Sequence, residues 1–236
     1  MSIPGTLNFR DVGGLPARGG VTREKVLFRS GNLAGIADEG RAALQDLGIR
    51  RIVDLREDDE LRSDPSPLDG LGIDTVRAPL FLGSTASFFA LDVSLAEMYR
   101  GLLDDAADRL VEVVRAVVAD QPVLVHCTVG KDRTGVTVAL ILAAAGVDDD
   151  DIVADYARTE ALLPAARNAR IVSFLRSLHP DAVHLEELAT RSPAPVMRGM
   201  LADLRARFGT PVDYLRAHGL ADAEVDELRR VLVRVT

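Results

Sequence analysis

One short segment restricts the fold of this chain more than any other: Pro122 to His126 (PVLVH), a strand whose core is almost wholly apolar. A strand of that kind belongs at the buried centre of a parallel or mixed sheet. Strand and helix patterns alternate before and after it. We predict strands at residues 26–29, 49–56 and 75–80, and helices at 38–47, 94–119 and 136–145. The sequence therefore predicts an α/β fold with a central, mostly parallel sheet flanked by helices.

Helical patterns fill the rest of the chain, about residues 148–236, with prolines between them. The acidic run Asp148 to Asp151 is read as the first turn of a helix, where the helix dipole favours negative charge, rather than as a cation site. The segment Arg191 to Pro195 (RSPAP) is the expected mobile loop. A length of 236 residues suits one sizeable core better than two, so we predict a single domain, 1–236.

The charge balance excludes several kinds of partner. The chain has 28 Lys and Arg against 36 Asp and Glu, a net charge of −8, so no overall positive field favours nucleic acid or anionic lipid. An anionic ligand must be captured locally. The chain shows no secretion signal, and no apolar run approaches the roughly 20 residues of a membrane-spanning helix. We therefore expect a cytoplasmic protein with no integral membrane segment.

Cys127 is the only cysteine, which excludes an internal disulfide framework and any multi-cysteine metal site. His179 and His184 are five residues apart and do not share a helical face, so no metal or other cofactor is expected. A lone cysteine is most often a small buried hydrophobe. The neighbours of Cys127 instead indicate a reactive thiol.

The buried strand leads directly into the loop Cys127 to Arg133 (CTVGKDR), which places the thiol at the carboxyl end of a central strand, where open α/β sheets bind ligands. The five intervening residues can form a ring of inward-pointing N–H groups at a helix N-terminus, and Gly130 permits the tight turn. The same field stabilises a thiolate. Arg133 can hold two phosphoryl oxygens with its planar guanidinium. These groups meet the needs of phosphoryl transfer without a metal.

His-Cys, five residues, then Arg-Thr resembles the signature of the cysteine-dependent protein tyrosine phosphatase superfamily. The form Gly-Lys-Asp-Arg-Thr-Gly resembles the bacterial atypical dual-specificity members, some of which also act on phosphoinositides. Further similarity lies in Asn8 to Gly14, Phe28 to Leu33 and Val53 to Arg56, and more loosely in Phe208 to Leu215. The resemblance implies a protein tyrosine phosphatase-like fold with a helical C-terminal part.

The resemblance also implies roles for the loop. Cys127 attacks phosphorus and becomes a phosphocysteine, Arg133 binds the phosphoryl group, and Thr134 helps the thiolate to leave. The backbone of the intervening residues completes the phosphate site: Thr128, Val129, Gly130, Lys131 and Asp132. His126 supports the loop. Lys131 adds a charge at the rim, where it could meet a second phosphate on an inositol ring.

The general acid is assigned by resemblance to Asp132, inside the loop, with Asp92 and Asp54 as alternatives. Asp54 and Arg56, at a strand end, are candidates for substrate contact, although an internal ion pair that orders a loop is the commoner arrangement. Arg10 and Asp11 are interpreted as structural.

The predicted function is hydrolysis of phosphate monoesters through a phosphocysteine, with phosphotyrosine as the main substrate and phosphoserine or phosphothreonine as further ones. The partner is then a phosphorylated protein or a phosphoinositide, and the oligomeric state stays open. Three alternatives remain: a phosphoinositide lipid phosphatase, a phosphate-binding module without turnover, and a rhodanese-like sulfurtransferase. The presence of Cys127, Arg133 and an acid candidate favours the enzyme over the binding module.

Overall fold

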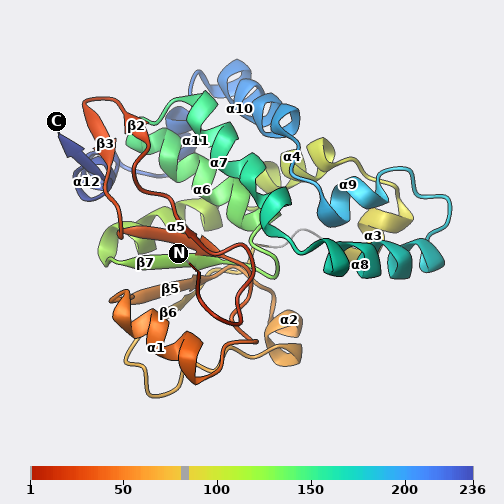
Figure 1. Ribbon diagram of the computed structural model, residues 1–236. Helices are drawn as coiled ribbons and strands as arrows, with labels where there is room; N and C mark the ends of the chain where they lie inside the picture. Colours follow the sequence, from red (N-terminus) through yellow and green to blue (C-terminus); the bar gives the residue numbers. More distant parts are fainter. Residues whose placement is uncertain (1, 81–84, 236) are drawn as a thin grey trace.

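The computed structural model describes residues 2–80 and 85–235 (Figure 1). Its main sheet has five strands in the order β1-β4-β7-β5-β6. Their bounds are Arg10–Asp11 for β1, Leu27–Ser30 for β4, Val123–His126 for β7, Arg51–Asp54 for β5 and Asp74–Arg77 for β6. All neighbours are parallel except β1, which is antiparallel to β4. The mostly parallel sheet is confirmed, with the apolar strand at its centre.

Both faces of this sheet are buried. Successive side chains of a strand point to opposite faces, so neighbouring residues of one strand pack into different hydrophobic clusters. Leu124 and Ile52 belong to a smaller hydrophobic cluster that includes residues of α1 (Asp38–Asp46). Val125 and Val53 belong to the larger cluster on the other face. Burial on both faces accounts for the continuous apolar run in β7.

Figure 1 shows α1 on one side of the sheet and most of the other helices on the opposite side. Between α1 and the loop that begins at Cys127, the helices are α2 (Asp58–Ser63), α3 (Thr85–Ala90), α4 (Leu95–Asp105) and α5 (Ala107–Ala119). Helices after it are α6 (Asp132–Ala145), α7 (Asp149–Leu162), α8 (Ala165–Leu178), α9 (Leu185–Thr190), α10 (Ala194–Phe208), α11 (Pro211–Ala217) and α12 (Asp222–Leu232). In Figure 1, α3, α8 and α9 form an arm that projects from the layers.

Two predicted helices have different bounds in the structure. The helix expected at 94–119 is two helices, α4 and α5, because Ala106 between them has non-helical backbone angles (φ −122°, ψ 21°). Hydrophobic spacing continues across a single non-helical residue and so does not reveal it. The helix expected from residue 136 begins at Asp132, so Asp132 and Arg133 lie in its first turn.

The helical C-terminal part is confirmed, with two corrections. The expected mobile loop at 191–195 is wrong: Ser192 is buried, its hydroxyl donates to the Ala157 carbonyl (3.2 Å), and α10 begins at Ala194. The chain also has a final strand, β8 (Val233–Val235), which pairs with β3 (Gly20–Thr22) beside β2 (Pro16–Ala17). As predicted, Asp148 to Asp151 begin a helix, α7.

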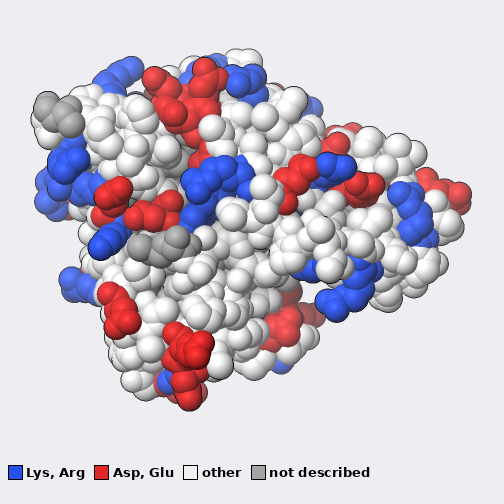
Figure 2. All heavy atoms as spheres, in the orientation of Figure 1, with Lys and Arg blue, Asp and Glu red and all other residues white. Residues whose placement is uncertain are grey.

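On the face drawn in Figure 2, acidic and basic side chains are interspersed, and neither sign dominates. No helix in residues 2–80 and 85–235 has the length and apolar character needed to cross a membrane.

Candidate active site

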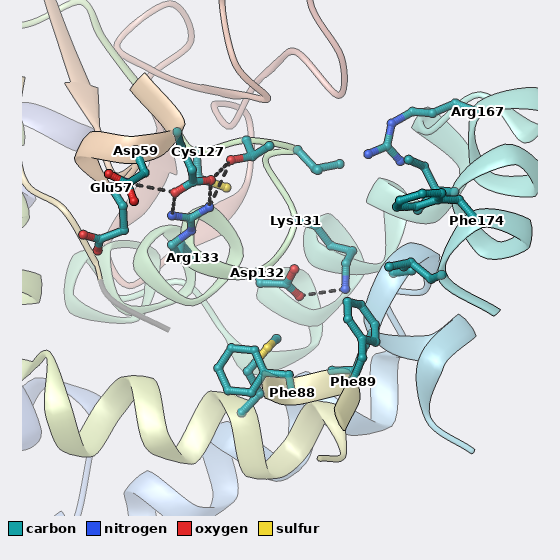
Figure 3. Close-up of a pocket in the computed structure, with 18 residues that line it drawn as sticks. Glu57, Asp59, Phe88, Phe89, Cys127, Lys131, Asp132, Arg133, Arg167 and Phe174 are labelled. Carbon is teal, nitrogen blue, oxygen red and sulfur yellow. Dashed lines mark hydrogen bonds and ion pairs between the residues drawn. The ribbon is translucent and has the colours of Figure 1, made fainter. Parts of the chain in front are cut away.

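The loop at 127–131 leaves the carboxyl end of β7 and enters α6, beside the carboxyl ends of β4 and β5. Ser30 and Asp54, the last residues of those strands, are both in register with His126. Cys127 lines a cavity of about 610 Å³ together with Thr128, Val129 and Lys131. Asp132 and Arg133 line the same cavity (Figure 3). The predicted nucleophile, acid and phosphate-binding residues are therefore brought together around one pocket.

The backbone of the loop is held from outside by donors to its carbonyl groups. The Asn8 amide and the Arg29 guanidinium donate to the Gly130 carbonyl at 2.7 and 2.9 Å. The backbone N–H of Asn32 donates to the Thr128 carbonyl at 3.0 Å. Because the N–H and C=O of a peptide unit point in opposite directions, carbonyls bonded outward leave N–H groups for an anion inside the loop.

Gly130 is required where it stands. Its φ is +71°, and a Cβ there would lie 2.4 Å from the backbone carbonyl of Ser30. A side chain would therefore be strained by the backbone conformation and would also clash with β4.

A buried ion cluster anchors the loop to α7. Asp155 accepts from Arg10 Nε and from Arg29 Nη1, both at 2.7 Å, and all three residues are buried. Burial raises the pKa of the Asp155 carboxyl, but the charges of Arg29 and Arg10 outweigh it and leave that pKa lowered. Arg10 is structural, as predicted, and so is Asp11, which accepts from the backbone N–H of Gly13 at 2.8 Å.

Arg133 is held by a carboxylate that sequence reasoning missed. Glu60 of α2 accepts from Arg133 Nη1 at 2.6 Å and from Nη2 at 2.7 Å, and the Thr128 hydroxyl donates to the same carboxylate. Burial alone would raise the pKa of Glu60. The hydrogen bonds and charge of Arg133 outweigh burial and lower this pKa to about 2. Such a two-point contact fixes the plane of the guanidinium before any phosphate arrives.

Asp132 faces the pocket between two donors. Its Oδ1 accepts from the Tyr99 hydroxyl at 2.9 Å and from Lys131 Nζ at 2.7 Å. Tyr99 in turn is 2.7 Å from the Tyr156 hydroxyl. Burial, followed by the nearby Asp132 charge, raises the pKa of Tyr99 well above its usual value, so this hydroxyl stays a donor. Sequence reasoning gave no role to Tyr99, because its distance from the loop along the chain hides the contact.

The other two acid candidates lie elsewhere. Asp54 is buried behind the loop, and Asp92 accepts from the backbone N–H of His184 at 2.8 Å. Neither lines the cavity that contains Cys127. Lys131 also differs from expectation: its side chain is 2% exposed and lies in the pocket wall, not at the rim.

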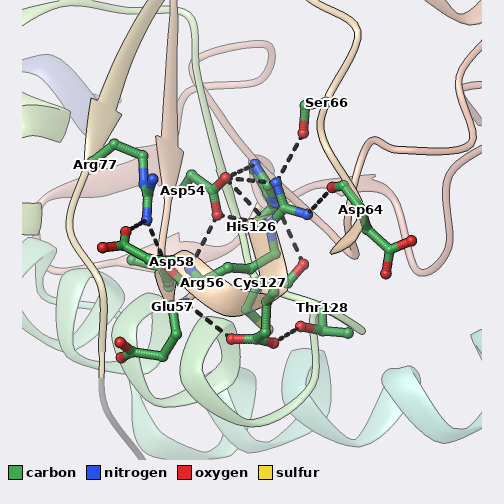
Figure 4. Close-up of polar contacts among 12 residues, drawn as sticks. Asp54, Arg56, Glu57, Asp58, Asp64, Ser66, Arg77, His126, Cys127 and Thr128 are labelled. Atoms are coloured by element: carbon green, nitrogen blue, oxygen red, sulfur yellow. Dashed lines mark hydrogen bonds and ion pairs between the residues drawn. The ribbon is translucent and has the colours of Figure 1, made fainter. Parts of the chain in front are cut away.

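Asp54 and Arg56 form a buried ion pair instead of contacting the pocket around Cys127 (Figure 4). Arg56 Nη2 is 2.7 Å from Asp54 Oδ2, and its Nη1 donates to the Asp64 carbonyl at 2.7 Å. The Arg56 side chain has no exposed surface, so its donors are used within the protein. Of the two interpretations left open by the sequence, these contacts favour the internal ion pair over substrate contact. The pair braces the segment between β5 and α2, which brings Glu60 to Arg133.

His126 is fully buried, with Nε2 3.7 Å from Asp54 Oδ2 and Nδ1 3.3 Å from the Cys127 carbonyl. Burial lowers the pKa of His126 to about 4, so the ring is neutral at pH 7. Thr134 is also buried, and its hydroxyl has no hydrogen-bond partner in the part of the chain that the structure describes.

The pKa of His126 predicts a pH dependence of stability. Unfolded, the ring binds a proton near pH 6.5; folded, it does so only near pH 4. Stability is therefore full above pH 6.5 and falls, by on the order of 3 kcal/mol, as pH drops to 4. Between pH 7 and pH 5, urea unfolding should show about 2 kcal/mol of this loss in the wild type and in His184→Gln, a control, but a smaller loss in His126→Gln. Equal pH dependence in all three proteins would contradict it.

The rest of the pocket is apolar or carries charge from other elements. Apolar side chains of its wall come from α3, α4, α8 and α9: Phe88, Phe89, Met98, Ile171, Phe174, Leu175, Leu188 and Ala189. Glu57, Asp59 and Glu60 line it from the α2 side, and Arg167 lines it from α8. In residues 2–80 and 85–235, no group of three or more His, Cys, Asp or Glu side chains is placed to hold a metal ion.

Comparison with known proteins decides the family. The model described as "Tyrosine phosphatase family" matches residues 1–234. The chain belongs to the tyrosine phosphatase family. This confirms the resemblance to tyrosine phosphatases.

The triple specificity protein phosphatase PtpB of Mycobacterium tuberculosis is 33% identical to this phosphatase, over 98% of each chain. A putative tyrosine-protein phosphatase of Cupriavidus necator is 33% identical, over 85% of this chain and 72% of that one. Among solved structures, the catalytic core of the PP-IP phosphatase SIW14 of S. cerevisiae has a TM-score of 0.44 and 17% identity, covering 86% of this chain and 95% of that one.

Proposed function

We propose that this phosphatase hydrolyses phosphate monoesters of proteins through a phosphocysteine at Cys127, with phosphotyrosine as its main substrate. The observation that carries the proposal is the meeting of Cys127, Asp132 and Arg133 around one cavity, at the end of the central strand. Phosphoserine and phosphothreonine are further substrates. The names of the relatives, which include tyrosine-protein and triple specificity phosphatases, support this assignment.

In the first step, the Cys127 thiolate attacks phosphorus and an S–P bond forms as the ester P–O bond breaks. Asp132 acts as the general acid and gives a proton to the leaving oxygen, so the product departs as an alcohol or phenol. Arg133 and the loop N–H groups bind the equatorial oxygens, where charge is spread in the transition state. Glu60 holds Arg133 in the orientation that this requires.

In the second step, a water molecule attacks phosphorus and its proton passes to the Asp132 carboxylate. The S–P bond breaks, inorganic phosphate leaves, and the thiolate is restored. The buried Thr134 hydroxyl supplies a donor that can stabilise the returning thiolate.

The apolar wall of the pocket supports phosphotyrosine as substrate. Phe88, Phe89 and Met98 line the cavity together with Cys127, and aromatic rings pack favourably against aromatic and thioether side chains. The alternative, a phosphoinositide phosphatase, depends on Lys131, which lines the cavity beside Asp132.

The proposal is tested with two aryl phosphates and an Asp132→Asn variant. The wild type should hydrolyse both p-nitrophenyl phosphate, whose leaving group needs little protonation, and phenyl phosphate, whose leaving group needs a proton. The amide of the variant keeps an acceptor for Tyr99 but cannot donate the proton. Because kcat/KM reports only the steps up to the phosphocysteine, it should fall about 10²–10⁴-fold with phenyl phosphate and less than about tenfold with p-nitrophenyl phosphate.

Equal losses with both substrates would remove Asp132 from the acid role. No turnover of either ester by the wild type, nor of a phosphotyrosine peptide, would leave a binding module. A wild type that hydrolyses only phosphoinositides would replace the protein substrate with a lipid one. Asp92→Asn is the matched control, since Asp92 does not line the cavity.

A further inference from the structure

Three cations line the pocket, and they differ in their partners. Arg133 is bonded to Glu60, and Lys131 to Asp132. Arg167 has no carboxylate within 4.0 Å among the described residues; its one hydrogen bond there is donated to the Asn168 side-chain oxygen at 3.2 Å. Among the described residues, Arg167 is therefore the pocket cation that forms no ion pair.

Local structure does not explain why an arginine stands at this position. Arg167 lies in the first turn of α8, where the helix dipole disfavours a positive charge. Burial, with a smaller contribution from Arg170 one turn further on, lowers the pKa of Arg167 from its usual value. An anion that reaches this guanidinium would relieve both costs.

The two sides of the pocket carry opposite charges. In Figure 3, Arg167 lies beside Phe174 on one side of the pocket, and Glu57 and Asp59 lie on the opposite side, beyond Arg133. A substrate with its phosphate on Arg133 thus meets acidic groups toward α2 and a free cation toward α8.

We propose that Arg167 is a second, anion-binding subsite, which selects phosphotyrosine peptides that carry an acidic residue on the side facing α8. This inference rests on the proposed function and names its substrate class. The wall near Arg167 is made of Phe174, Ile171 and Leu175. That surface suits a tyrosine ring and peptide side chains, whereas the hydroxyls of an inositol ring would lose their hydrogen bonds against it.

The test compares three phosphotyrosine peptides that differ only beside the phosphotyrosine: glutamine on both sides, glutamate on the amino side, or glutamate on the carboxyl side. For the wild type at low ionic strength, one glutamate peptide should have a kcat/KM about fivefold above the neutral peptide, the value of one partly exposed ion pair. The other should show no gain, because its glutamate faces Glu57 and Asp59. In Arg167→Gln the fivefold preference should disappear, because KM for the favoured glutamate peptide rises while kcat is unchanged.

Arg170→Gln is the matched control, since Arg170 is on the same helix but does not line the cavity, and it should keep the preference. Turnover of p-nitrophenyl phosphate, which has no second charge, should be the same in the wild type and in Arg170→Gln. If the wild type hydrolyses that ester but shows no preference between the peptides, the subsite is refuted and the proposed phosphatase activity stands. The same conclusion follows if Arg167→Gln keeps the preference for the glutamate peptide. An Arg167-dependent KM for inositol polyphosphates alone would also overturn the peptide assignment.

Discussion

Cys127→Ser is expected to lower kcat for p-nitrophenyl phosphate by at least about 10⁴-fold. A serine hydroxyl is not ionised at neutral pH and is a much weaker nucleophile than a thiolate. Removal of a nucleophile costs other hydrolases up to about 10⁶-fold in kcat. The substitution changes one atom of a buried side chain, so folding should be preserved.

The measurement pairs turnover with binding. Because the loop N–H groups and Arg133 are untouched, Cys127→Ser should still bind a phosphotyrosine peptide, within about tenfold of the wild-type KM. A variant that turns over normally would eliminate the phosphocysteine. A variant that loses both turnover and binding while its circular dichroism is unchanged would show that the sulfur itself holds the loop open.

With p-nitrophenyl phosphate, Arg133→Lys should cause the second largest loss, about 10³-fold in kcat. Lysine keeps the positive charge but offers a single ammonium, which cannot hold both Glu60 oxygens and also two phosphoryl oxygens. Arginines that stabilise phosphoryl-transfer transition states are worth about 10³–10⁵-fold. Steady-state kinetics with p-nitrophenyl phosphate measure the loss.

Arg62→Lys is the control for this substitution. Arg62 lies on α2 beside Glu60, and its side chain is 74% exposed, so the same chemical change there should leave kcat within about twofold. If Arg133→Lys kept kcat within about tenfold, a point charge would suffice and the two-point contact with Glu60 would have no part in catalysis.

The central strand and the phosphate loop were predictable because their determinants are local. The apolar run of β7 and the residues Cys127 to Arg133 are continuous in sequence, and a glycine marks the tight turn. Glu60 was not predictable in the same way. It lies on α2, a six-residue helix with no buried residue, so no hydrophobic periodicity marks it.

Contacts between distant segments were the other limit. Arg10 was interpreted as structural, but its partner, Asp155, is 145 residues away and looks from the sequence like an ordinary helix acid. The same holds for Tyr99, which meets Asp132 across 33 residues. For Asp54 and Arg56 the sequence left two interpretations open, and only their burial in the folded chain separates an internal pair from substrate contact.

The cluster behind the loop has a consequence for how binding responds to ionic strength. Arg10 and Arg29 are two buried cations that share one buried carboxylate, Asp155, so the cluster carries a net positive charge. Dissolved ions screen exposed charges within a Debye length but reach buried ones poorly. Attraction of phosphate by this buried charge should persist at salt concentrations that weaken attraction by exposed groups. Part of the affinity for phosphate should therefore not change with ionic strength.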